Sequence, residues 1–453
     1  MTWRYLIIAG ALHVALTTAI FTIGHFRILP NTFDQNGVGL TFAIDGTSYQ
    51  QVASGLAGVW QTNGFSAWLN SKAPFHSRLH SLSFVTFGRV LGHNILGAEP
   101  LNLFYYLAIL TLIYFLGLEV FSSRTGFVAA TLVALWPSFL FHSTQLMRDP
   151  LSIACFLALL FVLTLLLKRS FTPRAGVTLG IGGAGLVTMF WLARGNMWNV
   201  VLVTLAIAIV MLIGRMIHAR KFVIGNALVM LLILVAALFV PTRLESTSLP
   251  GVRPPTTALA IPSASQAAPS EGVWTRAINQ IGQRRAGFRF YTSFASNIDG
   301  DVQLRSAGAI IRFIPRAFVI GFFAPFPNMW VQAGNFGRTG RLLSGAETLA
   351  MYFLYVAAAI CIWQERRNLR MWLLFLVATS GMVALGLVVV NAGALYRIRY
   401  VFWMMLIVIA AEGIARLTYL TVFRTNFTKL RMSSSVVSNE AIKRTSEISS
   451  FQT

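Results

Sequence analysis

Charged side chains are scarce in this chain of 453 residues. Asp, Glu, Lys and Arg together make up 11% of it, whereas hydrophobic residues make up 56%, and the mean hydropathy is +0.68. A soluble domain does not need so much apolar surface. A helix that crosses a bilayer does need about 20 consecutive apolar residues, and the sequence contains many such runs. The composition therefore predicts a membrane protein.

Cysteines and the common catalytic motifs are also scarce. Only Cys155 and Cys361 occur, both inside apolar runs, where they serve as small hydrophobic side chains, so no redox chemistry is expected. The sequence has no tightly spaced metal motif, no glycine-rich phosphate loop before a helix and no Gly-x-Ser-x-Gly. These absences argue against soluble-nucleotide chemistry and against serine hydrolysis.

Acidic residues are fewer than basic ones, 14 against 36, which gives a formal net charge of +22. The Lys and Arg residues are scattered among loops and form no basic helix or aromatic-basic motif, so we expect no nucleic acid partner. Anionic membrane lipids and lipid-linked phosphates are the expected partners instead.

Ten apolar runs are long enough to be membrane spans, and the first of them is too long for a secretion signal. The predicted spans are Tyr5 to Phe26, Leu101 to Phe121, Gly126 to Phe141, Leu151 to Leu167, Gly176 to Ala193, Met197 to Gly214, Phe222 to Val240, Ala346 to Trp363, Met371 to Val390 and Tyr400 to Leu420. The predicted fold is therefore an all-α polytopic membrane protein with about ten transmembrane helices.

Short basic loops set the expected orientation, because Lys and Arg are enriched in cytoplasmic loops. Three such loops carry Lys168, Arg169 and Arg174; Arg215, Arg220 and Lys221; and Arg366, Arg367 and Arg370. With ten spans, this assignment places the N- and C-termini in the cytoplasm. It also leaves two large loops outside, at residues 27–100 and 241–345.

Two further apolar stretches, Leu79 to Ala98 and Ala307 to Phe326, carry charges near their centres, which is costly inside a bilayer. We expect both to form interfacial helices within the outer loops. Residues 1–421 then make one transmembrane domain, residues 250–270 a poorly ordered stretch, and residues 422–453 a basic, disordered cytoplasmic tail.

Charged residues at the outer ends of helices are the candidate site residues, because few basic residues are expected there. They are Arg148, Asp149, Arg194, Arg397 and Arg399. Asp149 suits either a catalytic carboxylate or a structural charge at a helix start. The forked side chains of Arg397 and Arg399 suit either phosphate binding or anchoring at the interface, and Arg194 suits either phosphate binding or a helix boundary.

The first outer loop adds a second carboxylate, Asp45, in the segment FAIDGTSYQQVASGL. It is either a helix cap or a general base exposed to a substrate. Tyr49 in the same segment is a candidate acceptor contact. His76 and His80 follow in the loop as candidate bases or metal ligands, although lone histidines more often serve neither role.

Several of these segments resemble the membrane glycosyltransferases of superfamily C. They are DGTSYQQVASGL, KAPFHSRLHSLSFVTFGRVLG, the long stretch that ends in STQLMRDPL, FFAPFPNMW and NAGALYRIRY. The resemblance covers most of residues 5–420. Within the superfamily, the chain is similar in particular to the bacterial relatives of protein O-mannosyltransferases and of the lipid A aminoarabinose transferase. This chain departs from many members in having Gly46 after Asp45, and Phe75 after Pro74.

The resemblance implies that Asp45 is a catalytic base on the acceptor, that Pro74 belongs to a loop on the membrane surface, and that Asp149 is a second site acid. It also implies that Arg397 and Arg399 face the phosphate of a polyprenyl-linked sugar donor. A divalent metal ion is the one cofactor that it leaves open. The expected enzyme is thus a glycosyltransferase of the bacterial inner membrane, acting on the non-cytoplasmic face.

Alternative functions remain at this stage. A polysaccharide polymerase or ligase with a lipid-pyrophosphate donor also has many spans and arginine-rich outer loops. A lipid-oligosaccharide flippase needs polar residues along a central path, which the late spans lack. A purely structural membrane protein needs no cluster of charges on one face. The acceptor of the expected transferase is a cell-envelope glycan, lipid or protein.

Overall fold

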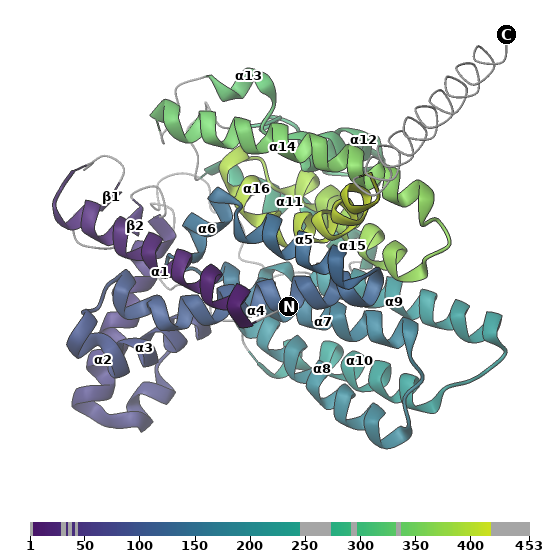
Figure 1. The fold of residues 1–453 in the computed structure, drawn as a ribbon, viewed down its shortest axis with the longest axis horizontal. Helices are drawn as coiled ribbons and strands as arrows, with labels where there is room; N and C mark the ends of the chain where they lie inside the picture. The colour runs from purple at the N-terminus through teal and green to yellow at the C-terminus, as the bar shows by residue number, and fades with distance from the viewer. Residues whose placement is uncertain are drawn as a thin grey trace, which may run out of the picture.

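The computed structural model describes residues 3–28, 33–34, 39–40, 44–244, 273–290, 297–331 and 337–417. This part of the chain is almost entirely helical (Figure 1). Its helices are α1 (Trp3–His25), α2 (Ile44–Asn70), α3 (Phe75–Leu91), α4 (Ile95–Val120), α5 (Ser123–Ala134), α6 (Pro137–Ser143), α7 (Asp149–Lys168), α8 (Pro173–Arg194), η1 (Gly195–Met197), α9 (Trp198–Ala219), α10 (Ile224–Arg243), α11 (Val273–Phe290), α12 (Ala307–Phe323), α13 (Pro327–Trp330), α14 (Gly337–Gln364), α15 (Leu369–Val388), α16 (Ala392–Ile398) and a last helix, Tyr400–Leu417. Two short strands, β1 (Phe33–Asp34) and β2 (Gly39–Leu40), pair antiparallel.

Eight helices in the described part of the chain are long and apolar enough to cross a membrane, or up to nine if one bent pair counts as a span. The chain is therefore an all-α, polytopic, integral membrane protein, as the composition predicts. One of the eight is a stretch of 47 residues, Pro173–Ala219, which contains α8, η1 and α9. At 1.5 Å per residue it is about 70 Å long, more than twice the hydrocarbon thickness. The stretch is therefore long enough for two spans, α8 and α9.

The bent pair is α5 with α6, which meet at an angle of 69°. The sequence predicts one span from Gly126 to Phe141, and the structure breaks it at Pro137. A residue before proline avoids the helical conformation, and Trp136 is indeed extended, with φ −73° and ψ 111°. The break directs α6 toward the turn that carries Arg148 and Asp149.

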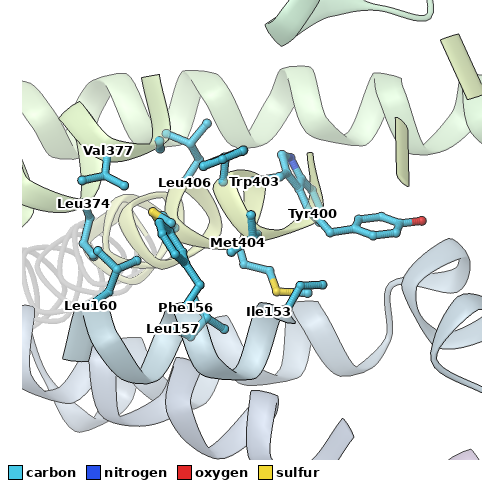
Figure 2. Close-up of a cluster of buried hydrophobic side chains, with 14 of the residues drawn as sticks. Ile153, Phe156, Leu157, Leu160, Leu374, Val377, Tyr400, Trp403, Met404 and Leu406 are labelled. Atoms are coloured by element: carbon cyan, nitrogen blue, oxygen red, sulfur yellow. The ribbon is translucent and has the colours of Figure 1, made fainter. Parts of the chain in front are cut away.

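The most enclosed helices are α7 and the last helix. In the most apolar part of each of these helices, 83% of the residues are buried, against 28% in α1. Figure 2 shows the last helix between α7 and α15, where apolar side chains of all three interdigitate. Ile153 and Tyr400 lie toward one end of this cluster, and Leu160 and Leu406 toward the other. The two central helices therefore run parallel, and their N-terminal ends meet on one side of the bundle.

Basic loops meet at the opposite end of the bundle, where α7 finishes. Lys168 and Arg169 pair with Glu119 of α4 at 2.7 and 2.5 Å. Arg215 donates to the carbonyl of Arg169 at 3.1 Å, and Arg370 donates to the carbonyl of Glu119. All three predicted basic loops therefore contribute residues to one end. The 20 residues of α7 separate this end from Asp149 by about 30 Å.

The predicted interfacial stretches take two different forms. Residues 79–98 are not one helix, because α3 ends at Gly92, whose φ is +82°, and Asn94 caps α4. The helix α12 lies along α15, since a Cβ atom added at Gly321 would overlap the carbonyl oxygen of Met382, and one added at Gly386 would overlap that of Ala317. Neither α3 nor α12 is among the candidate spans. Residues 250–270 and the tail 422–453 lie outside the described residues.

Candidate active site at the start of the two central helices

Asp149 is the first residue of α7, and it lies where α7, α8 and α16 meet. Its carboxylate pairs with the guanidinium of Arg194, at the end of α8, and lies 3.4 Å from Nε of Arg397, in α16. The side chains of Asp149 and Arg194 are 7% and 5% exposed. Asp149 is thus a buried carboxylate shared by two arginines.

Asp45 joins this cluster from the other side of Arg397. Oδ2 of Asp45 accepts a hydrogen bond from Nη2 of Arg397 at 2.7 Å, although 352 positions separate the two residues. The side chain of Asp45 is 48% exposed, unlike that of Asp149. Arg397 therefore bridges one accessible carboxylate and one buried carboxylate. Burial lowers the pKa of Arg397, but the negative charges of Asp149 and Asp45 raise it by more. The net pKa therefore lies above the usual value for arginine, and the guanidinium stays charged.

Tyr49 and His76 complete the wall of the cluster. Tyr49 lies one helical turn after Asp45 in α2, and its ring meets the His76 ring edge to face at a centroid distance of 4.2 Å. Burial raises the pKa of Tyr49, and the positive charge of Arg148 opposes this shift. Burial also places the pKa of His76 well below 6.5, with Arg148 and Arg194 among the charges that lower it further. Nε2 of His76 is buried and has no hydrogen-bond partner among the residues that the structure describes.

The cluster carries more positive than negative charge. Three arginines, Arg148, Arg194 and Arg397, stand beside two carboxylates, Asp45 and Asp149. Among the described residues, Arg148 forms no ion pair with a carboxylate. With His76 neutral, one positive charge is unmatched, and the cluster favours an anion carrying about one negative charge.

A narrow, largely apolar crevice lies beside the arginines, with a free volume of about 10 Å³, close to the size of one water molecule. Its lining comes from α7, α8, η1, α9, α16 and the last helix, and consists of Ser152, Ile153, Phe156, Phe190, Arg194, Met197, Val200, Arg397, Ile398, Val401 and Phe402. Arg194 and Arg397 both pair with Asp149, so they sit together at one end of the crevice. The site thus combines a cationic end with a narrow apolar crevice between candidate spans, and these helices must separate to admit a lipid chain.

Two candidate residues lie apart from the charge cluster. Arg399 is 1% exposed; it donates to the carbonyl of Ala324 and lies 4.8 Å from the Tyr396 ring centroid. It fixes the end of α12 against the last helix, and no contact joins it to Asp45 or Asp149 within the described residues. Pro74 precedes the first residue of α3 and is buried beside the start of the helix that carries His76.

The buried His76 predicts a pH-dependent stability. Its pKa is lowered in the folded state, so below about pH 6.5 the unfolded chain binds more protons and the folded state loses stability. The loss approaches 1.4 kcal/mol per pH unit for one such group, as an order of magnitude. Unfolding temperatures between pH 7.5 and 5.5 should fall less steeply for His76→Gln than for the wild type. Equal slopes for both proteins would contradict this role.

The sequence analysis missed a buried polar group near this site. His13, Glu99 and Ser143 are each buried and joined by hydrogen bonds across α1, α4 and α6. The available signal was His13 itself, an ionisable residue near the middle of the first apolar run. Glu99 gave no signal, because it lies just before the predicted second span.

The ligand set for a metal ion is thin in this cluster. Within the described ranges no three His, Cys, Asp or Glu side chains gather as a metal site, and both carboxylates already pair with arginine. No protein-family model matches the chain, and no curated protein or solved structure matches it either.

Proposed function

We propose that this protein is a membrane glycosyltransferase that moves a sugar from a polyprenyl-phosphate donor to a hydroxyl of a cell-envelope glycan, lipid or protein. The observation that carries the proposal is the position of Arg194 and Arg397 at one end of an otherwise apolar crevice. A lipid phosphate has the same two parts, an anionic head and an apolar chain. Arginine suits the head because its planar fork donates two parallel hydrogen bonds to phosphate oxygens.

The charge balance supports a donor with a single phosphate. A sugar attached to a lipid through one phosphodiester carries about one negative charge, which equals the unmatched charge of the cluster. As the bond between sugar and phosphate breaks, the phosphate gains a second charge. Arginines fixed in advance by Asp149 stabilise that charge without having to reorganise. A pyrophosphate donor would bring about two charges before the reaction starts.

The two carboxylates have different roles in this proposal. Asp45 is half exposed and within reach of an incoming acceptor, whereas Asp149 is enclosed by Arg194 and Arg397. The acceptor oxygen attacks the anomeric carbon of the sugar, its proton passes to Asp45, and the bond from carbon to phosphate oxygen breaks. The polyprenyl phosphate leaves with the bonding electron pair. Asp149 orients the two arginines throughout.

The location of the site agrees with the resemblance to superfamily C. Asp149 and the basic loops lie at opposite ends of α7, and Lys and Arg clusters favour the cytoplasm. We therefore propose that the site faces the non-cytoplasmic side of a bacterial inner membrane, with ten spans and both termini inside. Residues 27–100 and 241–345 form the outer loops of one transmembrane domain.

Mass spectrometry of envelope glycans, lipids and proteins tests the proposed function. Cells that lack this protein should lose one sugar from one such acceptor, and they should accumulate the corresponding polyprenyl-phosphate sugar. The wild-type gene should restore the sugar, and a gene encoding Asp45→Ala should not. Accumulation of a complete repeat unit on a lipid pyrophosphate would favour a polymerase or ligase instead. An unchanged envelope would reject both.

Arg397→Ala should weaken donor binding, because it removes one of the two arginines at the cationic end of the crevice. A hydrogen bond to a charged group is worth about 1.5–3 kcal/mol, so the Kd for a polyprenyl phosphate should rise about tenfold to 150-fold. Equilibrium titration of the protein in lipid nanodiscs measures this, with the uncharged polyprenol as control ligand. Arg316→Ala is the control variant, since Arg316 is exposed and pairs with Asp299 away from the cluster. Unchanged affinity in Arg397→Ala would reject the phosphate site.

A further inference from the structure

A second buried polar cluster joins three helices next to the site. Nδ1 of His13 lies 2.7 Å from Oε1 of Glu99, and Nε2 of His13 lies 3.0 Å from Oγ of Ser143. Thr17, one turn after His13 in α1, donates to Oε2 of Glu99 at 2.7 Å. All four residues are buried. A polar group in such an environment is retained only with its partners satisfied, and here the four residues come from three helices, α1, α4 and α6.

The arrangement of Ser143, His13 and Glu99 has the order of a serine hydrolase triad, but it cannot act as one in this position. Ser143 has no exposed surface, and its hydroxyl also lies within hydrogen-bond distance of the Leu140 carbonyl, at 2.8 Å. A nucleophile needs an approach path and room for the attacked carbonyl. The geometry therefore serves structure, and the question is which part of the molecule it holds.

A parallel bridge holds the next residue of the chain. Asn102 lies three positions after Glu99, on the same face of α4. Its Nδ2 donates to the carbonyl of Thr144 at 3.1 Å, and its Oδ1 lies 3.1 Å from Nε2 of His80. Ser143 and Thr144 are consecutive, so α4 is hydrogen-bonded to the end of α6 at two adjacent residues. One contact reaches Ser143 through His13, and the other reaches Thr144 directly.

Ser143 and Thr144 lie a few residues before the site residues Arg148 and Asp149 in the chain. Only Gln145, Leu146 and Met147 separate Thr144 from Arg148, and all three are buried. The turn has little backbone support of its own within the described residues, chiefly the bonds from the amides of Gln145 and Met147 to the carbonyls of His142 and Gln145. A displacement at Ser143 would therefore be passed to Asp149, which must meet Arg194 and Arg397 at the same time.

We propose that His13, Thr17 and Glu99 are positioning residues: through Ser143 they hold the turn of residues 143–149 so that Asp149 keeps its two arginines in place for the donor phosphate. Within the described part of the chain, no hydrogen bond or ion pair joins any of the three to the charge cluster. The effect on catalysis rests on the proposed function, whereas the effect on the turn does not. Loss of these contacts lowers the rate of transfer more than the affinity for the donor, because Asp149 keeps its charge and its pairs with Arg194 and Arg397. Only the alignment of the arginines with the charge that develops in the transition state is relaxed.

Thr17→Val and Thr18→Val form a matched pair for the test. Both remove a hydroxyl from α1 with little change in shape. Thr17 donates to Glu99, whereas the exposed Thr18 donates to the carbonyl of Val14 in its own helix, at 2.8 Å. Hydrogen exchange of the full-length protein in nanodiscs, without any substrate, reports on the turn. We expect amides in residues 143–149 to exchange about fivefold faster in Thr17→Val, the effect of one lost hydrogen bond, and at the wild-type rate in Thr18→Val.

The catalytic part of the proposal is read from the kinetics of the same two variants, with the acceptor identified from the envelope comparison. Thr17→Val should lower kcat about fivefold with an unchanged KM for the donor, and Glu99→Gln should lower it further. If amides in the turn of Thr17→Val exchange at the wild-type rate, these contacts do not hold the turn and the proposal is rejected. Faster exchange with an unchanged kcat rejects the positioning role. Faster exchange in a protein that transfers no sugar rejects the proposed function and the positioning role. It still supports the structural part of the proposal, in which these contacts hold the turn.

Discussion

Asp149→Asn should abolish sugar transfer and lower the free energy of unfolding by about 3–5 kcal/mol, the cost of breaking a buried ion pair from one side. Asparagine keeps the size of the side chain, so the loss comes from the charge. In this variant Arg194, 5% exposed, loses its carboxylate, and Arg397 keeps only Asp45. The arginines then lose the orientation that the donor phosphate needs. Chemical unfolding in nanodiscs measures the stability, and donor titration measures the binding.

Asp299→Asn is the control for this change, because Asp299 also pairs with an arginine but at the surface. The Asp299 and Arg316 side chains are 25% and 46% exposed, and such pairs contribute about 0–1 kcal/mol. The two variants make the same chemical change in the two environments. Equal and small losses of stability would show that Asp149 is not the buried anchor of the cluster.

The helices and the shared end of the basic loops could be predicted because they follow from one-dimensional rules. A run of about 20 apolar residues reports a span wherever its neighbours lie. Arg148 and Asp149 also stood out, since charges are rare in so apolar a chain. The break at Pro137 was harder, because prolines are tolerated in membrane helices and only the bend of 69° shows that this one ends α5.

The pairings of the site residues could not be predicted, because they join distant parts of the chain. Asp45 and Arg397 meet across 352 positions. The pattern Arg-x-Arg in NAGALYRIRY predicts two donor contacts, but two positions on a helix are about 200° apart. One of the two arginines therefore had to turn away. Arg397 faces the carboxylates, and Arg399 points to the carbonyl of Ala324.

Asp45→Ala should lower kcat for sugar transfer about 10²-fold to 10⁴-fold, the range for loss of a general base, with little change in expression. Asp45 is half exposed, and its pair with Arg397 contributes no more than about 1 kcal/mol to stability. Donor affinity should stay close to that of the wild type, because Arg194 and Arg397 remain paired with Asp149. Steady-state kinetics with saturating donor and varied acceptor measure the effect.

The two aspartate variants together separate the roles of the carboxylates. If Asp45 takes the proton, Asp45→Ala loses turnover alone, whereas Asp149→Asn loses stability, donor binding and turnover together. The exposed Asp301 supplies the control, and Asp301→Ala should behave as wild type. Wild-type turnover in Asp45→Ala would end its assignment as base. The base would then have to be sought next to it, where the His76 ring packs against the Tyr49 ring and its buried Nε2 has no hydrogen-bond partner in the described part of the chain.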